Sequence, residues 1–160
     1  SDLQVAQQMF ARARSIYHPL TVASIETVFR RAAEAEITAE SIVRLFIAAY
    51  NAHNVDAMVT RVSDDVRWMS IDGGRVQTET SGKAELAAEM AAYFENWPSS
   101  RSEIRHIQTV GGYVSAVEKA TWLSEDGEKS QCALAIYEVE ENLISNVWYH
   151  AAQPCGNPGE

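Results

Sequence analysis

Apolar residues recur at intervals of three and four through the first part of the chain, which is the spacing of one buried face on an α-helix. This pattern predicts one helix over about 3–17 and a second over 20–36. Pro19 separates them, because the residue before a proline avoids the helical region of backbone space. We expect these helices to form an N-terminal extension, residues 1–38, that packs on the rest of the chain or on a partner subunit.

The same spacing predicts three further helices. Thr38 can cap one over about 39–50, Asn54 can start a short one with Asp56 in its first turn, and Ser81-Gly82 opens a third that Pro98 stops. The expected buried face of the 39–50 helix is Ile42, Val43, Phe46, Ile47 and Tyr50. The expected face of the last helix is Leu86, Met90, Tyr93, Phe94 and Trp97.

The pattern changes to strands after the 54 helix and again after Pro98. One strand is expected over 64–71, followed by a turn at 72–74. Four more are expected over 102–110, 113–123, 129–140 and 142–150, joined by short hairpin-type connections. Successive hairpins imply antiparallel neighbours, so the fold class is α+β, with helices on one face of a sheet. Residues 153–160, rich in Pro and Gly, are expected to be a flexible tail.

Composition and charge limit the classes of partner that this protein can bind. The chain has 160 residues, 46% of them apolar, which suits a globular domain. The net charge of −9 argues against nucleic acid and against an anionic membrane surface. No apolar run approaches the ~20 residues of a membrane helix. Cys132 and Cys155 could pair in an oxidising compartment, but two cysteines in this setting favour reduced thiols in a cytoplasmic protein.

The stretch 50–68 gathers acids and a histidine, which raises the question of a metal site. Such a site needs three or four converging ligands. His53 and Asp56 lie at one end of the short helix, whereas Asp64 and Asp65 lie at the other end. Helix capping and turn chemistry therefore explain the stretch better. The chain has no Gly-rich phosphate loop or clustered Cys/His pattern, so no cofactor and no metal are expected.

Three stretches, 46–68, 81–94 and 142–150, together with the element order, resemble the nuclear transport factor 2-like superfamily. The resemblance is closest to its SnoaL-like branch, which includes polyketide cyclases and ketosteroid isomerase-like proteins. It implies that residues 39–152 form a curved antiparallel sheet wrapped around helices, a cone with an internal cavity. It also implies a small hydrophobic ligand and a homodimer.

Glu118 is the first candidate for chemistry in such a cavity. Strand alternation places it among apolar neighbours on one face of the 113–123 strand, where a carboxyl group tends to have a raised pKa suited to a general acid or base. The alternative is an exposed Glu118, or one paired with a nearby Arg or Lys. On the last strand, Tyr149 and His150 are candidate donors to a ligand oxygen. They lie on opposite faces, and a bulge would exchange which one points inward.

The candidate ligand-binding residues are mostly large and apolar. Helical and strand spacing explains most of the aromatic residues as core, but some of them must line a cavity, and Trp68 is the first of these. A lone histidine on a strand, such as His106, is more often structural. The full set is Phe46, Tyr50, Trp68, Ser70, Met90, Phe94, His106 and Trp122.

Two known enzyme branches of the superfamily are not reproduced. By approximate alignment, Phe46 and Ser70 stand where ketosteroid isomerases place a Tyr and an Asp. The Tyr, Asn, Arg and two Asp of limonene-epoxide hydrolases correspond here to Trp68, Ser70, Lys119, Thr121 and Tyr149. This departure argues against those two activities. The resemblance and the apolar surroundings of Glu118 favour a binder of a small hydrophobic, carbonyl-containing molecule, with proton-transfer chemistry of isomerase, cyclase or dehydratase type. The alternative is a non-catalytic ligand-binding or dimeric assembly module.

Overall fold

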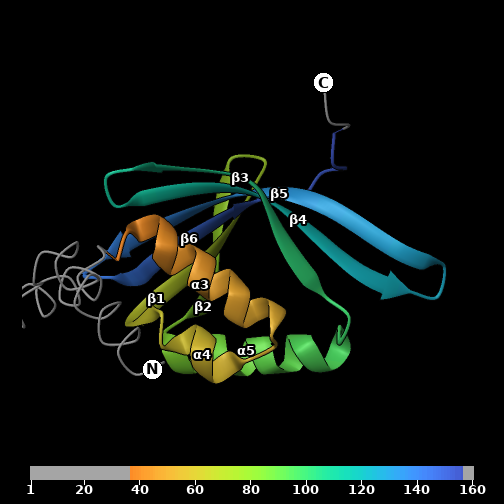
Figure 1. Cartoon of the computed structure of the whole chain (residues 1–160), viewed down its shortest axis with the longest axis horizontal. Helices are drawn as coiled ribbons and strands as arrows, with labels where there is room; N and C mark the ends of the chain where they lie inside the picture. Colours follow the sequence, from red (N-terminus) through yellow and green to blue (C-terminus); the bar gives the residue numbers. More distant parts are fainter. Residues whose placement is uncertain (1–36, 157–160) are drawn as a thin grey trace, which may run out of the picture. The chain divides into compact units, whose positions relative to one another are not determined.

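The computed structural model describes residues 37–156 (Figure 1). The two helices expected over 3–17 and 20–36 and the end of the expected tail, 157–160, lie outside these residues. The described elements follow the predicted order of helices, strand, helix and four-stranded meander, which confirms the α+β class. They are α3 (Ala39–Asn51), α4 (Val55–Val59), β1 (Val62–Asp72), β2 (Arg75–Ser81), α5 (Lys83–Asn96), β3 (Arg101–Val110), β4 (Tyr113–Ser124), β5 (Gly127–Glu140) and β6 (Leu143–His150).

The strands form one six-stranded sheet in the order β2-β1-β6-β5-β4-β3. Every neighbouring pair is antiparallel except β1 and β6, which run parallel. The sheet is curved, and α3, α4 and α5 lie on its concave side (Figure 1). Within residues 37–156, no helix has the length and apolar character needed to cross a membrane.

Strand β2 is a correction to the sequence-based assignment, which placed no strand between the turn and the helix at Ser81-Gly82. Its side chains are exposed apart from Thr80, so it shows no apolar alternation. The hairpin depends instead on Gly73 and Gly74, whose φ angles of 53° and 79° suit the tight turn that a right-twisted hairpin requires. Pairing with β1 stabilises this strand, and the sequence pattern carries no signal of that pairing.

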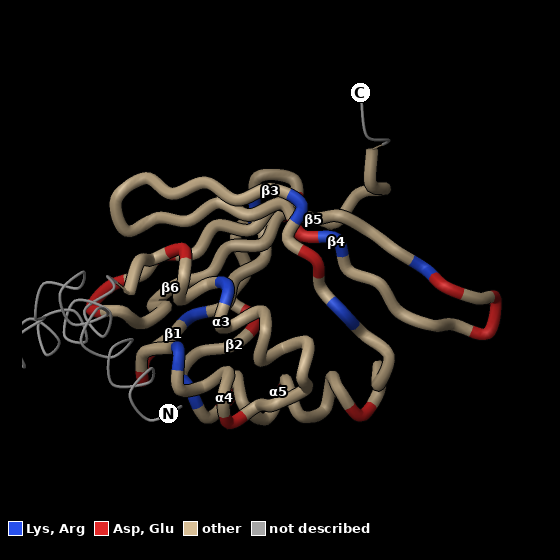
Figure 2. Tube along the Cα trace, viewed as in Figure 1, with Lys and Arg blue, Asp and Glu red and all other residues tan. Residues whose placement is uncertain are grey.

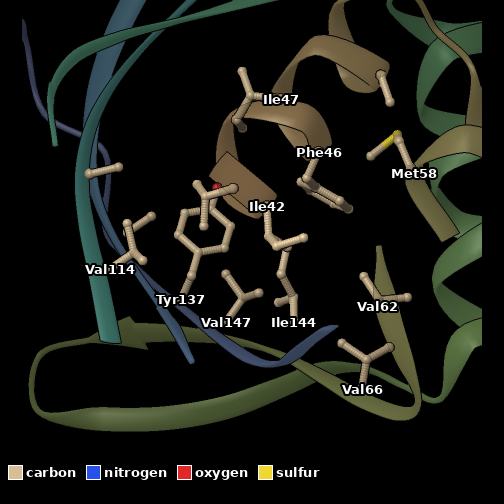
Figure 3. Packing of buried hydrophobic residues seen from close by; sticks show 14 of the residues in the cluster. Ile42, Phe46, Ile47, Met58, Val62, Val66, Val114, Tyr137, Ile144 and Val147 are labelled. Carbon is tan, nitrogen blue, oxygen red and sulfur yellow. The ribbon is translucent and has the colours of Figure 1, made fainter. Parts of the chain in front are cut away.

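The core forms where α3 meets the inner face of the sheet. Thr38 caps this helix as predicted, its hydroxyl accepting from the Ser41 amide at 3.1 Å. The four predicted residues before Tyr50 are buried, and Phe46 is only 1% exposed. Figure 3 shows this face packed against side chains of β1, β4, β5 and β6, which include Val62, Val66, Val114, Tyr137, Ile144 and Val147.

The predicted buried face of α5 is only partly correct. Leu86 and Phe94 are buried, but Tyr93 and Trp97 are 38% and 43% exposed. The physical reason is the position of the helix, which packs against α4 and the β1–β2 hairpin rather than across the meander. Trp97 lies just beyond the last helical residue and meets the ring of Trp122 edge-on, with centroids 6.4 Å apart.

The hairpin of β4 and β5 pairs without interruption from Tyr113–Glu138 to Ser124–Gly127 and projects beyond its neighbours (Figure 1). Its tip carries acidic residues, among them Glu125 and Asp126 (Figure 2). Exposed charge of this kind disfavours edge-to-edge pairing with other strands.

The two cysteines form a disulfide, which corrects the prediction of reduced thiols. Cys132 lies in β5, and its amide and carbonyl groups also pair with those of Gln153, both at 2.8 Å. Gln153 and Cys155 are therefore held against β5, although the composition had suggested a flexible tail from 153 onward. The spacing of Cys132 and Cys155 along the chain does not show this proximity, because the intervening β6 hairpin creates it.

We expect Cys155→Ser to lower the free energy of unfolding by about 2–4 kcal/mol, because the disulfide restricts the unfolded chain. Chemical denaturation with and without a dithiol reductant measures the effect. The reductant should destabilise the wild type by a similar amount and leave Cys155→Ser unchanged. Equal midpoints for all four samples would contradict a stabilising role for the disulfide.

Candidate functional site

A cavity of about 340 Å³ lies between the helices and the concave side of the sheet, within the range of small-ligand sites. Most of its wall is apolar or aromatic: Phe46, Ile47, Tyr50, Met58, Trp68, Met90, Tyr93, Ala120 and Ala133. Four lining residues are exposed and mark its mouth: Tyr93, Gln131, His150 and Ala152. Of the described residues that line it, none is Lys or Arg.

Glu118 is a cavity residue, on the face that strand alternation assigned to it. Its strand neighbours Val114 and Ala116 on this face are fully buried, and Glu118 itself is 5% exposed. Across the β4–β5 pair it faces the small residue Ala133. Its hydrogen-bond partners are hydroxyl groups, not the Arg or Lys of the alternative interpretation.

Three hydroxyl groups surround this carboxyl group, and we name the four residues together the Glu118 cluster: Glu118, Ser102, Tyr137 and Tyr149. The Tyr137 hydroxyl lies 2.5 Å from Oε1, and the Tyr149 hydroxyl lies 2.6 Å from Oε2. Ser102 donates to Oε2 at 3.2 Å. The two tyrosine hydroxyls are themselves 2.8 Å apart. The cluster joins β3, β4, β5 and β6, so the curvature of the sheet brings it together.

Burial controls the protonation of this cluster. It raises the pKa of Glu118, because a charged carboxylate is costly in an apolar cavity, while hydrogen bonds from Tyr137, Tyr149 and Ser102 oppose that shift. Burial and the adjacent carboxyl group also raise the pKa of both tyrosines well above the usual value. The tyrosines therefore keep their protons, and Glu118 is the member of the cluster that is able to gain or lose one.

The raised pKa of Glu118 predicts a pH dependence of stability. Between its ordinary range and its raised pKa, the folded protein binds one more proton than the unfolded chain. Raising the pH through this window should therefore lower the free energy of unfolding. The amide introduced by Glu118→Gln cannot titrate, so the difference between wild type and this variant, followed from about pH 4 to about pH 9, isolates the effect. A difference independent of pH would contradict a raised pKa.

Several predicted site residues do line the cavity. Phe46, Tyr50, Trp68 and Met90 contribute to its wall. On the last strand, Val147 is fully buried and the next residue on its face, Tyr149, reaches Glu118. The structure thereby decides which face of that strand points inward. His150, on the opposite face, reaches only the exposed mouth.

His106 does not line the cavity, which corrects the sequence-based assignment. The pairing of β3 with β4 shifts by one residue between Ile104 and His106. This bulge reverses the alternation, so Ile104 and Ile107 pack against the core while His106 is exposed.

Ser70 and Trp122 also lie outside the cavity wall. The Ser70 hydroxyl donates to Glu79 of β2 at 2.5 Å, so the strand missed in the sequence accounts for this side chain. Trp122 stands on the inner face of β4 but farther along the hairpin, where it packs on Trp97. The alternation of side chains along a strand predicts which face of the sheet each one lies on. It does not predict where along the strand the cavity ends.

The stretch 50–68 contains the end of α3, the short helix α4 and the start of β1, and a cap forms at Asn54 as predicted. The Asn54 side chain accepts from the Ala57 amide at 2.9 Å and caps α4. The His53 ring stacks on Phe94 with centroids 4.2 Å apart, so Phe94 belongs to the core and not to the cavity wall. His53 Nε2 also lies 2.8 Å from Arg101 Nη1. Across residues 37–156 no group of His, Cys, Asp and Glu is placed to hold a metal.

Tyr137 and Ser102 are the members of the cluster that the sequence did not identify. A signal for Tyr137 exists in the register of the β4–β5 hairpin, which pairs Tyr137 with Val114. Val114 and Glu118 share a face, so Tyr137 had to share it as well. For Ser102 the chain carries no comparable signal, because the β3 bulge disturbs the register nearby.

A family model of the SnoaL-like domain matches residues 43–147. This chain therefore belongs to the SnoaL-like domain family, and its fold is that of the nuclear transport factor 2-like proteins, as the resemblance implied. No curated protein matches the sequence.

Solved structures agree with this assignment. A cystatin-fold protein from Novosphingobium aromaticivorans, itself uncharacterised, is 30% identical, with a TM-score of 0.62 over 70% of this chain and 97% of that one. A nuclear transport factor 2-like protein of unknown function from Cytophaga hutchinsonii is 17% identical, with a TM-score of 0.58 over 76% and 95%. A protein from Xanthomonas campestris, provisionally assigned as a polyketide cyclase, is 20% identical, with a TM-score of 0.53 over 71% and 89%. The last two show the fold alone.

Proposed function

We propose that this protein binds a small hydrophobic, carbonyl-containing molecule in the cavity and catalyses a proton transfer on it, of isomerase, cyclase or dehydratase type. The observation that carries the proposal is one buried carboxyl group, Glu118, in a mostly apolar cavity and in contact with the Tyr149 hydroxyl at 2.6 Å. A group able to give or take a proton is thereby placed beside a hydroxyl that can bind an oxygen.

The wall of the cavity supports a neutral, apolar ligand. Trp68 stacks on Tyr149 with ring centroids 5.2 Å apart, and Phe46 lies 5.7 Å from Trp68. These rings offer flat apolar surfaces. Among the lining residues that the structure describes, Lys and Arg are absent, so a phosphate or carboxylate would be buried without a counter-charge at high cost.

The geometry suggests how the chemistry would proceed. With the ligand's carbonyl oxygen at the Glu118 cluster, the Tyr149 hydroxyl can donate to it and stabilise negative charge that develops there. Glu118 then lies close to the carbon beside the carbonyl, where it can exchange a proton. The same enolisation step can lead to isomerisation, to aldol-type ring closure or to loss of water.

Binding is tested with a panel of neutral aromatic ketones of graded size, followed by thermal shift and by ligand-detected NMR. Ala133 lines the cavity opposite Glu118, whereas the next residue, Leu134, is 41% exposed on the other face of β5. We expect Ala133→Trp to fill the cavity and lower affinity at least tenfold, and Leu134→Trp to bind like wild type. No binding to wild type, or equal binding to both variants, would contradict the proposal.

The homodimer remains a prediction from the sequence. Deleting residues 1–36 and comparing the mass of both forms by sedimentation tests it. A full-length dimer that becomes a monomer would support assembly through the N-terminal extension. A full-length monomer would contradict the homodimer, and a truncated dimer would place the interface within the cone domain.

A further inference from the structure

The carboxyl group and the two tyrosine hydroxyls of the Glu118 cluster form a closed triangle of short contacts. Glu118 Oε1 lies 2.5 Å from the Tyr137 hydroxyl, which lies 2.8 Å from the Tyr149 hydroxyl, which lies 2.6 Å from Glu118 Oε2. Each contact has hydrogen-bond length, and each hydrogen bond uses one proton. Every tyrosine supplies only one hydroxyl proton. Three hydrogen bonds therefore require a third proton, and only the carboxyl group can carry it.

With Glu118 ionised, one side of the triangle would bring two oxygens together with no hydrogen between them. When both tyrosines donate to the carboxylate, the unsatisfied side is the 2.8 Å contact between Tyr137 and Tyr149. Tyr137 is fully buried, so no water can supply the missing hydrogen bond to its hydroxyl oxygen. An unmade hydrogen bond of this kind is costly in a low-dielectric site.

A neutral Glu118 satisfies every atom. Oε1–H donates to Tyr137, Tyr137 donates to Tyr149, and Tyr149 donates to Oε2. Oε2 is then a carbonyl oxygen, and it also accepts a hydrogen bond from the Ser102 hydroxyl, at 3.2 Å. The result is a ring of three donors and three acceptors, in which each bond strengthens the next.

On this geometry, and resting on the proposed function, we propose that Glu118 is protonated in the resting protein at neutral pH, and that a ligand opens the ring into a proton relay. The relay runs from Glu118 through Tyr137 to Tyr149, and Tyr149 delivers the proton to the ligand's oxygen. Tyr137 does not line the cavity, so it is a positioning and relay residue behind the two groups that do.

The groups around Glu118 fit a neutral carboxyl. The other titratable residues of the cavity and of the Glu118 cluster are Tyr137 from β5, Tyr149 and His150 from β6, Tyr50 from α3 and Tyr93 from α5. Neither Lys nor Arg stands among the described cavity residues to stabilise a carboxylate. Burial acts in the same direction and raises the pKa of Glu118.

The relay passes one proton from the protein to the ligand's oxygen, and Glu118 takes one proton back from the ligand's carbon. The Tyr149 proton moves to the ligand's carbonyl oxygen, the Tyr137 proton replaces it, and the Glu118 proton replaces that of Tyr137, which leaves Glu118 ionised. The Glu118 carboxylate then takes a proton from the carbon beside the carbonyl, and the electron pair of that C–H bond forms the enol double bond. The ligand has become its enol, and Glu118 has regained its proton. This sequence selects neutral ketones or aldehydes that carry a hydrogen on the adjacent carbon.

The test uses the full, ligand-free chain labelled with ¹³C at the glutamate side-chain carboxyl carbons. Glu118→Gln removes one resonance and so assigns Glu118. We expect that resonance to have the chemical shift of a protonated acid at neutral pH. A carboxylate shift at neutral pH, titrating in the ordinary glutamate range, would overturn the proposal.

Tyr137→Phe gives a second, independent result. If Glu118 donates to Tyr137, loss of that acceptor should shift the titration midpoint of Glu118 downward. If Tyr137 only donates to a carboxylate, its loss should shift the midpoint upward, and that outcome would also overturn the relay. Tyr113→Phe is the matched control and should leave the titration midpoint of Glu118 unchanged. Tyr113 donates instead to the carboxylate of Glu138, at 2.9 Å, on the exposed side of the sheet.

These measurements need no ligand, so they separate the two proposals. A ligand panel that fails would contradict the proposed function and leave the protonation result standing. A Glu118 that is ionised at neutral pH would overturn the relay, while a simple general-base role in the same cavity would survive.

Discussion

Glu118→Gln is expected to lower the rate of the proton-transfer step by about 10²–10⁴-fold, the range that a positioned acid or base contributes. The amide keeps the size of the side chain and can still hydrogen-bond to Tyr137 and Tyr149, so the cavity should hold its shape. What it loses is the ability to give and take a proton. We therefore expect kcat to fall and KM to change little, measured on a ketone that the binding panel identifies.

Glu138→Gln is the matched control for that experiment. Glu138 also accepts from a tyrosine, and in addition from the Asn146 side chain at 2.8 Å, but it belongs to the outer face of β5. The same chemical change there should leave kcat within about twofold of wild type, as expected for a group outside the reacting site. An equal loss in both variants would point to general destabilisation, and full activity of Glu118→Gln would remove Glu118 from the mechanism.

Phe46→Ala is expected to lower the free energy of unfolding by about 3–5 kcal/mol, the usual cost of truncating a buried phenylalanine. Phe46 is 1% exposed and contacts the rings of both Trp68 and Tyr137. It also forms part of the cavity wall, so its removal should join a new void to the existing space. Denaturant unfolding measures the loss, with the slope checked for two-state behaviour.

Leu45→Ala provides the comparison, since Leu45 is the preceding residue of the same helix and is 44% exposed. We expect a loss of only about 0.5–1 kcal/mol there, because little apolar surface returns to water. Equal losses in the two variants would mean that α3 contributes through helix propensity and not through its contact with the sheet. The proposed active site depends on that contact, because the ring of Tyr137 meets the ring of Phe46 edge-on, with centroids 6.4 Å apart (Figure 3).

The elements that local sequence determines were predicted correctly. The caps at Thr38 and Asn54 depend on side chains three residues from the amides they bind, and the buried face of α3 depends on spacing within one helix. The hairpins of the meander likewise depend on short turns. Strand alternation also placed Glu118 on the inner face of β4, because that strand pairs with β5 without a bulge.

Tertiary structure alone decided the features that depend on residues far apart in the sequence. Strand β2 exists through its pairing with β1, the parallel contact of β1 with β6 joins the β1–β2 hairpin to the meander, and Cys132 meets Cys155 through the β6 hairpin. A single bulge in β3 turned His106 outward.

The hydroxyl cluster around Glu118 shows the same limit. Glu118 is identified within one strand, but its partners come from three others, and the curvature of the sheet brings their oxygens within hydrogen-bond distance. The sequence by itself determined which residue could carry the proton, because side-chain chemistry and strand period are local properties. Which groups share that proton was decided by the fold, because distances between strands are set by packing and register.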